Sequence, residues 1–262
     1  MGSLSPGGTA TVATVGAVLL GFVACGAALY LTGRGGVEHA RFDLVRRSSG
    51  APGRLAFELR RYAPAVAAIT RVPASGGGGG GDAMQRATSR GFRPLAQYIF
   101  GGNTGATSVA MTAPVVSEPL LSPGARGASR SIAMTAPVVS QPGDEEGEVE
   151  VSFIMPSRFT RACELPAPLS RGIELRELPE RFEAVASLGG GSSANGARAA
   201  AAARELLASL RADGLHPVPA PPGAGVLVDG MRVVLRAYSY DPPWTPPFLR
   251  RNEVAIAIEA PA

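Results

Sequence analysis

Apolar and polar residues alternate along several short segments of the chain, and this alternation predicts strands. In residues 55–61, Leu55, Phe57 and Leu59 alternate with small or charged residues, which is the period of a strand with one buried face. Residues 149–155 repeat this pattern, with an apolar residue at every second position. The remaining predicted strands are 65–72, 107–116, 131–139, 232–240 and 253–259.

A longer segment, 82–100, has the three- and four-residue spacing of an amphipathic helix. This spacing places Phe92, Leu95 and Ile99 on one face. Pro94 lacks the amide proton that a helix interior uses, so a kink or a restart is expected beside it. The segment is therefore predicted to be an interrupted helix.

A weak internal repeat indicates how these elements combine. Glu58–Arg60 recurs as Glu174–Arg176, and Ala65–Ala67 recurs as Ala184–Ala186. Each pair of strands is followed by a glycine-rich break and a helix, the second over residues 195–213. The sequence therefore predicts an α+β fold in which a pseudo-twofold repeat of strand–helix–strand units forms a distorted antiparallel β-barrel with two helices.

The N-terminal segment Val12–Leu31 contains no charged residue. As a helix it would span about 30 Å, which is the thickness of a bilayer's hydrocarbon core. Arginines follow this segment and none precedes it, which favours a single-pass anchor with the body on the cytoplasmic or equivalent side. A cleaved signal or transit peptide is the alternative. The organelle stays open, with the plastid as one candidate.

These features divide the chain into four parts. The expected organisation is an N-terminal tail, a transmembrane anchor, a polar tether and one folded domain, at residues 1–8, 9–32, 33–53 and 54–260. Six consecutive glycines at 76–81 have no side chains to pack and are expected to form a flexible insertion.

Charge and cysteine content narrow the function. All 25 basic residues are arginines, and they are scattered, so no basic stripe supports nucleic-acid binding. The two cysteines, Cys25 and Cys163, do not form a zinc signature. Glu58, Glu174 and Glu177 are interpreted as charges on strand surfaces, and no catalytic set appears. An enzyme is therefore not predicted.

Five motifs then occur in a characteristic order. They are FELRRY at 57–62, YIFGGN at 98–103, MTAPV at 111–115, FIMPS at 153–157 and YDPPW at 240–244. Their order resembles that of the SOUL haem-binding family, over about residues 55–259. The second copy of MTAPV, within 133–139, is similar to a subgroup of that family.

The resemblance implies binding of haem or another tetrapyrrole. Together with the uncharged N-terminal segment, it predicts a membrane-anchored carrier, buffer or sensor. It implies an apolar groove beside the first helix, where arginines would meet the propionates. The candidate ligand-binding residues lie on this helix or in the doubled motif: Arg86, Arg90, Phe92, Arg93, Leu95, Ile99, Met111 and Met134. For each apolar helix residue the alternative is an ordinary core position, and for each arginine a solvated one.

The axial ligand of a bound iron stays open. His39 belongs to the expected tether and His216 to a loop, so neither is expected to be essential, and no dedicated metal site is predicted. Tyr62 and Cys163 are further possible iron ligands, beside the two methionines. The alternative function is a small-molecule effector-binding or protein-interaction module on the same barrel without haem.

Overall fold

The computed structural model describes residues 38–50, 52–73, 80–104, 135–136, 138–142, 148–189, 197–220, 225–241, 245 and 249–261. All of them belong to one compact unit. Within these ranges, no helix is long and apolar enough to cross a membrane. The expected anchor, Val12–Leu31, lies outside the described residues.

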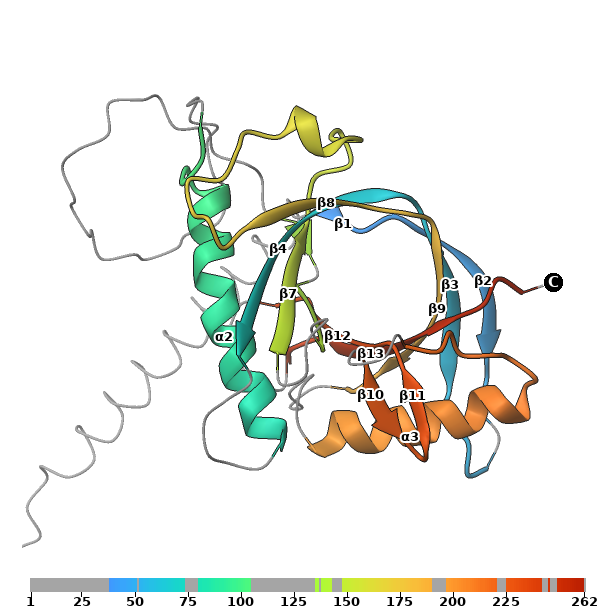
Figure 1. Ribbon diagram of the computed structural model, residues 1–262. Coiled ribbons are helices and arrows are strands. Elements are labelled where there is room, and N and C mark those ends of the chain that lie inside the picture. The colour runs from blue at the N-terminus through green and yellow to red at the C-terminus, as the bar shows by residue number, and fades with distance from the viewer. Residues whose placement is uncertain are drawn as a thin grey trace, which may run out of the picture. The chain divides into compact units, whose positions relative to one another are not determined.

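The core of the unit is a nine-stranded sheet in which every neighbouring pair of strands is antiparallel. Its strands, in spatial order, are β2 (Phe42–Ser48), β3 (Phe57–Tyr62), β9 (Arg181–Ser187), β13 (Asn252–Ile258), β12 (Leu235–Ser239), β6 (Val138–Pro142), β7 (Glu148–Ile154), β4 (Ala65–Pro73) and β8 (Glu174–Leu178). The sheet curls into a half-barrel (Figure 1). The predicted α+β class is confirmed.

Two small sheets accompany the large one. Strand β1 (Glu38–His39) pairs in parallel with β5 (Thr135–Ala136), and β10 (Val226–Val228) pairs with β11 (Met231–Val233) in a hairpin. A short 3-10 helix, η1 (Ala162–Glu164), follows β7.

With β2 set aside, the strand order shows the predicted pseudo-twofold symmetry: β3, β9, β13 and β12 correspond to β8, β4, β7 and β6. The equivalence of Glu58–Arg60 with Glu174–Arg176 is confirmed. The predicted equivalence of Ala65–Ala67 with Ala184–Ala186 is wrong by three residues. Leu59 pairs with Ala184, whereas its counterpart Leu175 pairs with Ala68. Ala68, and not Ala65, is therefore the equivalent of Ala184. Both links, β3 to β4 and β8 to β9, have two residues, so the two copies align without a gap.

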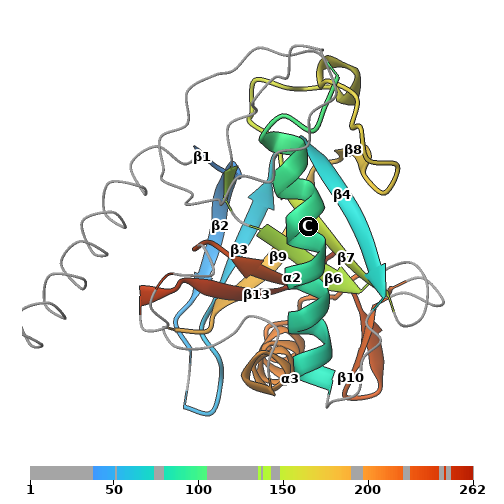
Figure 2. The ribbon, with the colours of Figure 1, turned by 90° about the vertical axis from the view of Figure 1, so that its left-hand side faces the viewer.

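Two helices pack on one face of the sheet. Helix α2 (Gly80–Ile99) lies along β4 and β7, and α3 (Ala197–Ala212) packs on β9 and β13 (Figures 1 and 2). A Cβ on Gly91 would lie 2.6 Å from Val151 Cγ2, so this close helix–sheet contact requires glycine. The helix does not restart near Pro94, because Leu95 and Ile99, both fully buried, hold its last turns on the sheet.

The expected tether at 33–53 contains two strands. Strand β1 begins at Glu38, and β2 pairs with β3 from Phe42 to Ser48, with an irregularity at Leu44. Six of the seven residues of β2 are exposed, so burial imposes little alternation on its sequence. This explains why the alternation did not predict the strand.

Candidate ligand-binding site

A cavity of about 200 Å³ opens between β1, the link from β3 to β4, and the segment that follows β7. Pockets for drug-sized ligands usually measure about 300–1,000 Å³, so this one can hold only part of a large flat ligand. Its wall combines apolar groups with basic ones. The main contributors are His39, Arg41, Tyr62, Pro64, Ile154, Met155, Phe159 and Arg181.

Hydrogen bonds donated by two backbone amides fix the rim of this cavity. The Ser157 amide donates a hydrogen bond to Glu38 Oε1 at 3.1 Å, which ties β1 to the segment after β7. The Ala63 amide donates to the Arg41 carbonyl at 3.1 Å, which ties the same rim to the β3–β4 link. His39 lies between these two anchors. It is exposed, and its ring centroid is 5.9 Å from that of Tyr240.

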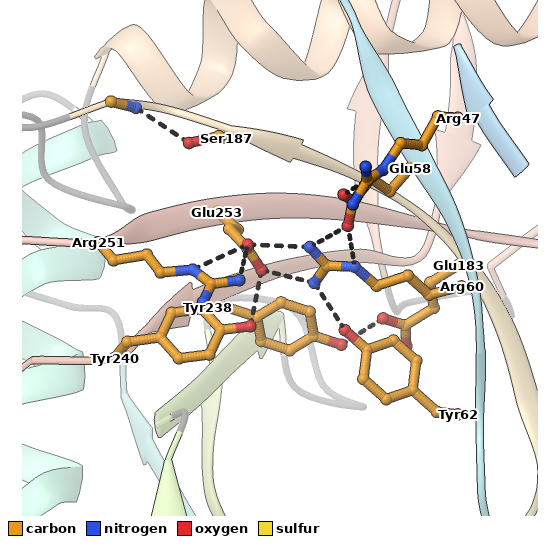
Figure 3. Close-up of polar contacts among 11 residues, drawn as sticks. Arg47, Glu58, Arg60, Tyr62, Glu183, Ser187, Tyr238, Tyr240, Arg251 and Glu253 are labelled. Atoms are coloured by element: carbon orange, nitrogen blue, oxygen red, sulfur yellow. Dashed lines mark hydrogen bonds and ion pairs between the residues drawn. The ribbon is translucent and has the colours of Figure 1, made fainter. Parts of the chain in front are cut away.

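Behind the cavity, polar side chains form what we call the Arg60–Glu253 cluster, consisting of Glu58, Arg60, Tyr62, Tyr240, Arg251 and Glu253 (Figure 3). Arg60 donates two hydrogen bonds to the Glu253 carboxylate, at 2.8 and 3.0 Å. The Tyr240 hydroxyl donates to Glu253 Oε2 at 2.7 Å. Arg60 also donates to the Tyr62 hydroxyl at 3.2 Å. Glu253 therefore holds Tyr240 beside His39 directly and holds Tyr62 in the cavity wall through Arg60.

Burial sets the protonation states in this cluster. Burial alone raises the pKa of the Glu253 carboxyl, but the hydrogen bonds and charge of Arg60 outweigh it, and the net pKa is lowered. Burial raises the pKa of Tyr62 to about 12 and also raises the pKa of Tyr240. At neutral pH the carboxylate is ionised and both tyrosines are neutral, so the tyrosine hydroxyls can donate.

A second buried carboxylate, Glu183, holds another part of the wall. Arg181 Nε and Arg236 Nη1 each donate to Glu183 Oε1 at 2.8 Å, and the Tyr238 hydroxyl bonds Oε2. Burial raises the pKa of Glu183, but the charges of Arg236 and Arg181 outweigh it, so the net pKa is lowered. Arg181 Cζ lies 4.7 Å from the centre of the Tyr62 ring. The guanidinium is thus fixed against the aromatic wall of the cavity.

The pseudo-twofold repeat contains a counterpart, the Arg176–Glu150 cluster, formed by Arg71, Gln141, Glu150, Glu174 and Arg176. The strand registers make Arg176 the equivalent of Arg60, and Glu150 the equivalent of Glu253. Arg176 donates to Glu174 at 2.9 Å and to Glu150 at 3.3 Å. None of these five residues lines the cavity described above.

The positions of the tyrosines distinguish the two clusters. Leu178 is the counterpart of Tyr62, and Gln141 is the counterpart of Tyr238. Arg236 Nε donates to Gln141 Oε1 at 2.9 Å. Arg236 also bonds Glu183, so polar contacts run across the inner face of the sheet from one half to the other.

The residues predicted on the first helix do not line this cavity. Leu95 and Ile99 have no exposed surface and belong to the core beneath α2. Phe92 is half-buried, and its ring lies 5.3 Å from that of Phe153. The three arginines of α2 are exposed, and Arg90 donates to a backbone carbonyl at 2.9 Å. A ligand beside α2 would therefore meet Phe92 and the arginines Arg86, Arg90 and Arg93.

Other expected site residues are dispersed. Met111, Met134 and the first MTAPV motif lie outside the described residues. Cys163 is exposed in η1, and His216 is exposed after α3. In the part of the chain that the structure describes, no three His, Cys, Asp or Glu side chains gather to hold a metal ion.

Sequence reasoning missed His39, Arg181 and Glu253 as members of the site. A charge at alternate positions of a strand indicates a solvated face in an open sheet, whereas here the curled sheet buries that face. Met155 could have been found, because it lies in the FIMPS motif that supports the family resemblance. In the structure it directly follows β7 and lines the cavity.

Three solved structures that resemble this chain are distant from it in sequence. The C-terminal domain of EcmrR is 11% identical, with a TM-score of 0.46, and the match covers 78% of this chain and 96% of that one. A hydrolase from Listeria innocua is 9% identical, with a TM-score of 0.41, and the match covers 77% and 91%. A putative transcription regulation protein from Staphylococcus aureus MU50 is 8% identical, with a TM-score of 0.37, over 79% and 99%. Likenesses at this level carry no conclusion about function.

Family membership rests on sequence. No curated protein matches the chain. The family model described as SOUL heme-binding protein matches residues 37–121 and 122–257, which together are more than half of the chain. The first match begins next to β1, so it includes both strands of the expected tether. The chain therefore belongs to the SOUL heme-binding protein family.

Proposed function

We propose that this protein binds a tetrapyrrole reversibly, as a carrier, buffer or sensor, and does not transform it. The observation that carries the proposal is membership of a heme-binding family across residues 37–257. The cavity supports it, because apolar and aromatic groups beside fixed guanidinium groups suit a flat ring that bears carboxylates. Tyr62, Phe159 and Arg181 supply these groups.

The direct test is a titration of the full chain with haemin, followed by absorbance in the Soret region. We expect a shifted band that saturates at about one equivalent, against a matched blank without protein. Metal-free protoporphyrin, followed by fluorescence, tests whether binding needs the iron. A titration that never saturates, or that follows the blank, contradicts the proposal and favours a barrel that binds a different ligand or a protein.

The sequence-based location of the ligand is a separate proposal with its own test. A tetrapyrrole beside α2 would place its propionates near Arg86, Arg90 or Arg93, each at an exposed position. A paired hydrogen bond of this kind contributes about 1–2 kcal/mol, so replacing all three arginines by glutamine should weaken haemin binding by about 5- to 30-fold. Unchanged affinity in a folded triple variant contradicts this location.

Membrane attachment is also a proposal, and it depends on the uncharged segment Val12–Leu31. We expect the full chain to stay in the membrane pellet after a carbonate wash. The control is a full-length variant with two charged residues introduced into the middle of this segment, which should move to the wash. Recovery of the intact, uncleaved natural chain in the wash contradicts the proposal.

A further inference from the structure

We propose that the cavity beside β1 receives one edge of the tetrapyrrole, and that His39 at its rim binds the iron. The inference rests on the proposed function and names its site, which differs from the face of α2. Three independent features of the described residues support it: the size of the cavity, the groups on its rim, and the cluster behind it.

The size of the cavity fits an edge and excludes the whole ring. About 200 Å³ lies below the usual range for a drug-sized ligand, and a tetrapyrrole is at least that large. The buried part of the macrocycle would contact Tyr62, Met155 and Phe159, which line the wall. The rest would cover the rim, where His39 and Arg41 are both exposed.

The rim offers the two kinds of group that haem needs. A neutral imidazole is a common protein ligand of haem iron, and His39 is the histidine that lines the cavity. The other histidine, His216, is exposed after α3 and is absent from the cavity wall. Arg41 and Arg181 line the same cavity, so a propionate that enters it meets a guanidinium. Arg181 is already held by Glu183 and would contribute its charge in place.

The Arg60–Glu253 cluster prepares this site. Tyr240 lies beside the His39 ring, and its hydroxyl is held by Glu253. Arg251 Cζ also lies 4.3 Å from the centre of the Tyr240 ring. The ring is therefore held by a cation as well as by the hydrogen bond of its hydroxyl to Glu253. We assign Tyr240 as a positioning residue, because its ring is held in place beside the His39 imidazole and would restrict the orientations of that imidazole.

The test compares two exposed histidines in the full chain. His39→Ala should weaken haemin binding by about tenfold or more and should change the Soret band and the electron paramagnetic resonance spectrum of the bound iron. His216→Ala, the matched control, should leave both unchanged. Metal-free protoporphyrin should bind the His39→Ala variant as tightly as the natural chain, because that ligand has no iron to coordinate.

Two further variants separate positioning from packing. Arg41→Gln should weaken haemin and metal-free protoporphyrin alike, by a few-fold, since both carry propionates. Tyr240→Phe keeps the ring but loses the bond to Glu253, so it should change the spectrum of bound haemin while metal-free protoporphyrin binding stays constant. Tyr240→Phe with an unchanged spectrum overturns the positioning role.

The outcomes also distinguish this inference from the proposed function. If the natural chain binds neither ligand, the proposed function fails and the site fails with it. If the natural chain binds haemin and His39→Ala binds it equally well with the same spectrum, only the site is overturned. Loss of binding in the α2 triple variant together with full binding in His39→Ala would place the ligand beside α2 instead.

Discussion

The two polar clusters on the inner face of the sheet occupy equivalent places but differ in their surroundings. In the Arg60–Glu253 cluster the side chains of the central pair are 4% and 3% exposed. In the Arg176–Glu150 cluster the arginine is 32% exposed, although the glutamate is 4% exposed. Only the first includes tyrosines, and only the first adjoins the cavity beside β1. The same strand geometry thus supports a buried ion pair behind a cavity in one half and a partly solvated ion pair in the other.

The largest expected difference between the clusters is in stability. Glu253→Gln leaves Arg60 charged and buried with its main partner neutralised, and removing one partner of a buried pair costs about 3–5 kcal/mol. Glu150→Gln leaves arginines that water can reach, so its cost should be about 1 kcal/mol. Urea unfolding of both variants measures the difference. Equal losses would show that exposure of the arginine does not decide the energy.

Part of this loss should appear in how the free energy of unfolding changes at acidic pH. The pKa values of Glu253 and Glu183 are lowered by folding, from an ordinary value of 4.5. The folded state therefore binds these protons less tightly, and the stability is present above pH 4.5 and is lost as the pH falls through the lower folded values. Unfolding free energies between pH 7 and pH 2 should decline less steeply in Glu253→Gln than in Glu150→Gln, which keeps both carboxyls.

A smaller effect on stability is expected at alkaline pH. Of the two clusters, only the Arg60–Glu253 cluster contains tyrosines, whose hydroxyls titrate in this range. Folding raises the pKa of Tyr62 from 10.0 to about 12. Stability is therefore complete below pH 10 and declines as the pH rises toward 12, by about 2 kcal/mol for this group. Tyr62→Phe should flatten the decline. Because Leu178 is its counterpart, Leu178→Val should lower stability by the same amount at pH 9 and at pH 12.

The smallest effect on stability is expected for Glu174 and Glu58, the more exposed carboxylates of the two clusters. Glu174 is 44% exposed and pairs with Arg176, so Glu174→Gln should cost at most about 1 kcal/mol. Its counterpart Glu58 is 28% exposed and bonds the buried Arg60, so Glu58→Gln should cost more. Thermal unfolding at low and high salt measures both. A larger loss for Glu174→Gln would reverse the comparison.

The sequence predicted the elements that bury apolar side chains. Strands β3, β4, β7 and β13, and both helices, appear within a few residues of their expected bounds, because each contributes apolar side chains to a core. Strand β2 was not predicted, because its side chains are mostly exposed. The strand expected at 232–240 is divided between β11 and β12.

The site was harder to predict than the fold, for a physical reason. Glu174, predicted to be a surface charge, is 44% exposed, whereas Glu58, predicted in the same way, is 28% exposed and bonds the buried Arg60. The prediction assumes an open sheet with one solvated face. Curling of the sheet turns that face inward, and charges from strands far apart in sequence then pair, as Arg60 does with Glu253. His39 and Tyr240, which lie near opposite ends of the domain in sequence, are also brought into contact by the fold. Such contacts are set by the curling of the sheet and leave no local pattern in the sequence.

The exchange of strands between the two halves has a consequence for folding. Strand β3 of the first half pairs with β9 of the second, and β8 of the second pairs with β4 of the first. Neither half can complete its hydrogen-bonded ladder alone, so the two must assemble in one cooperative step dominated by distant contacts, which makes folding slow. If one half were produced by itself, the strand edges that pair with the other half would be exposed. We expect two copies of such a half to pair through these edges as a swapped dimer.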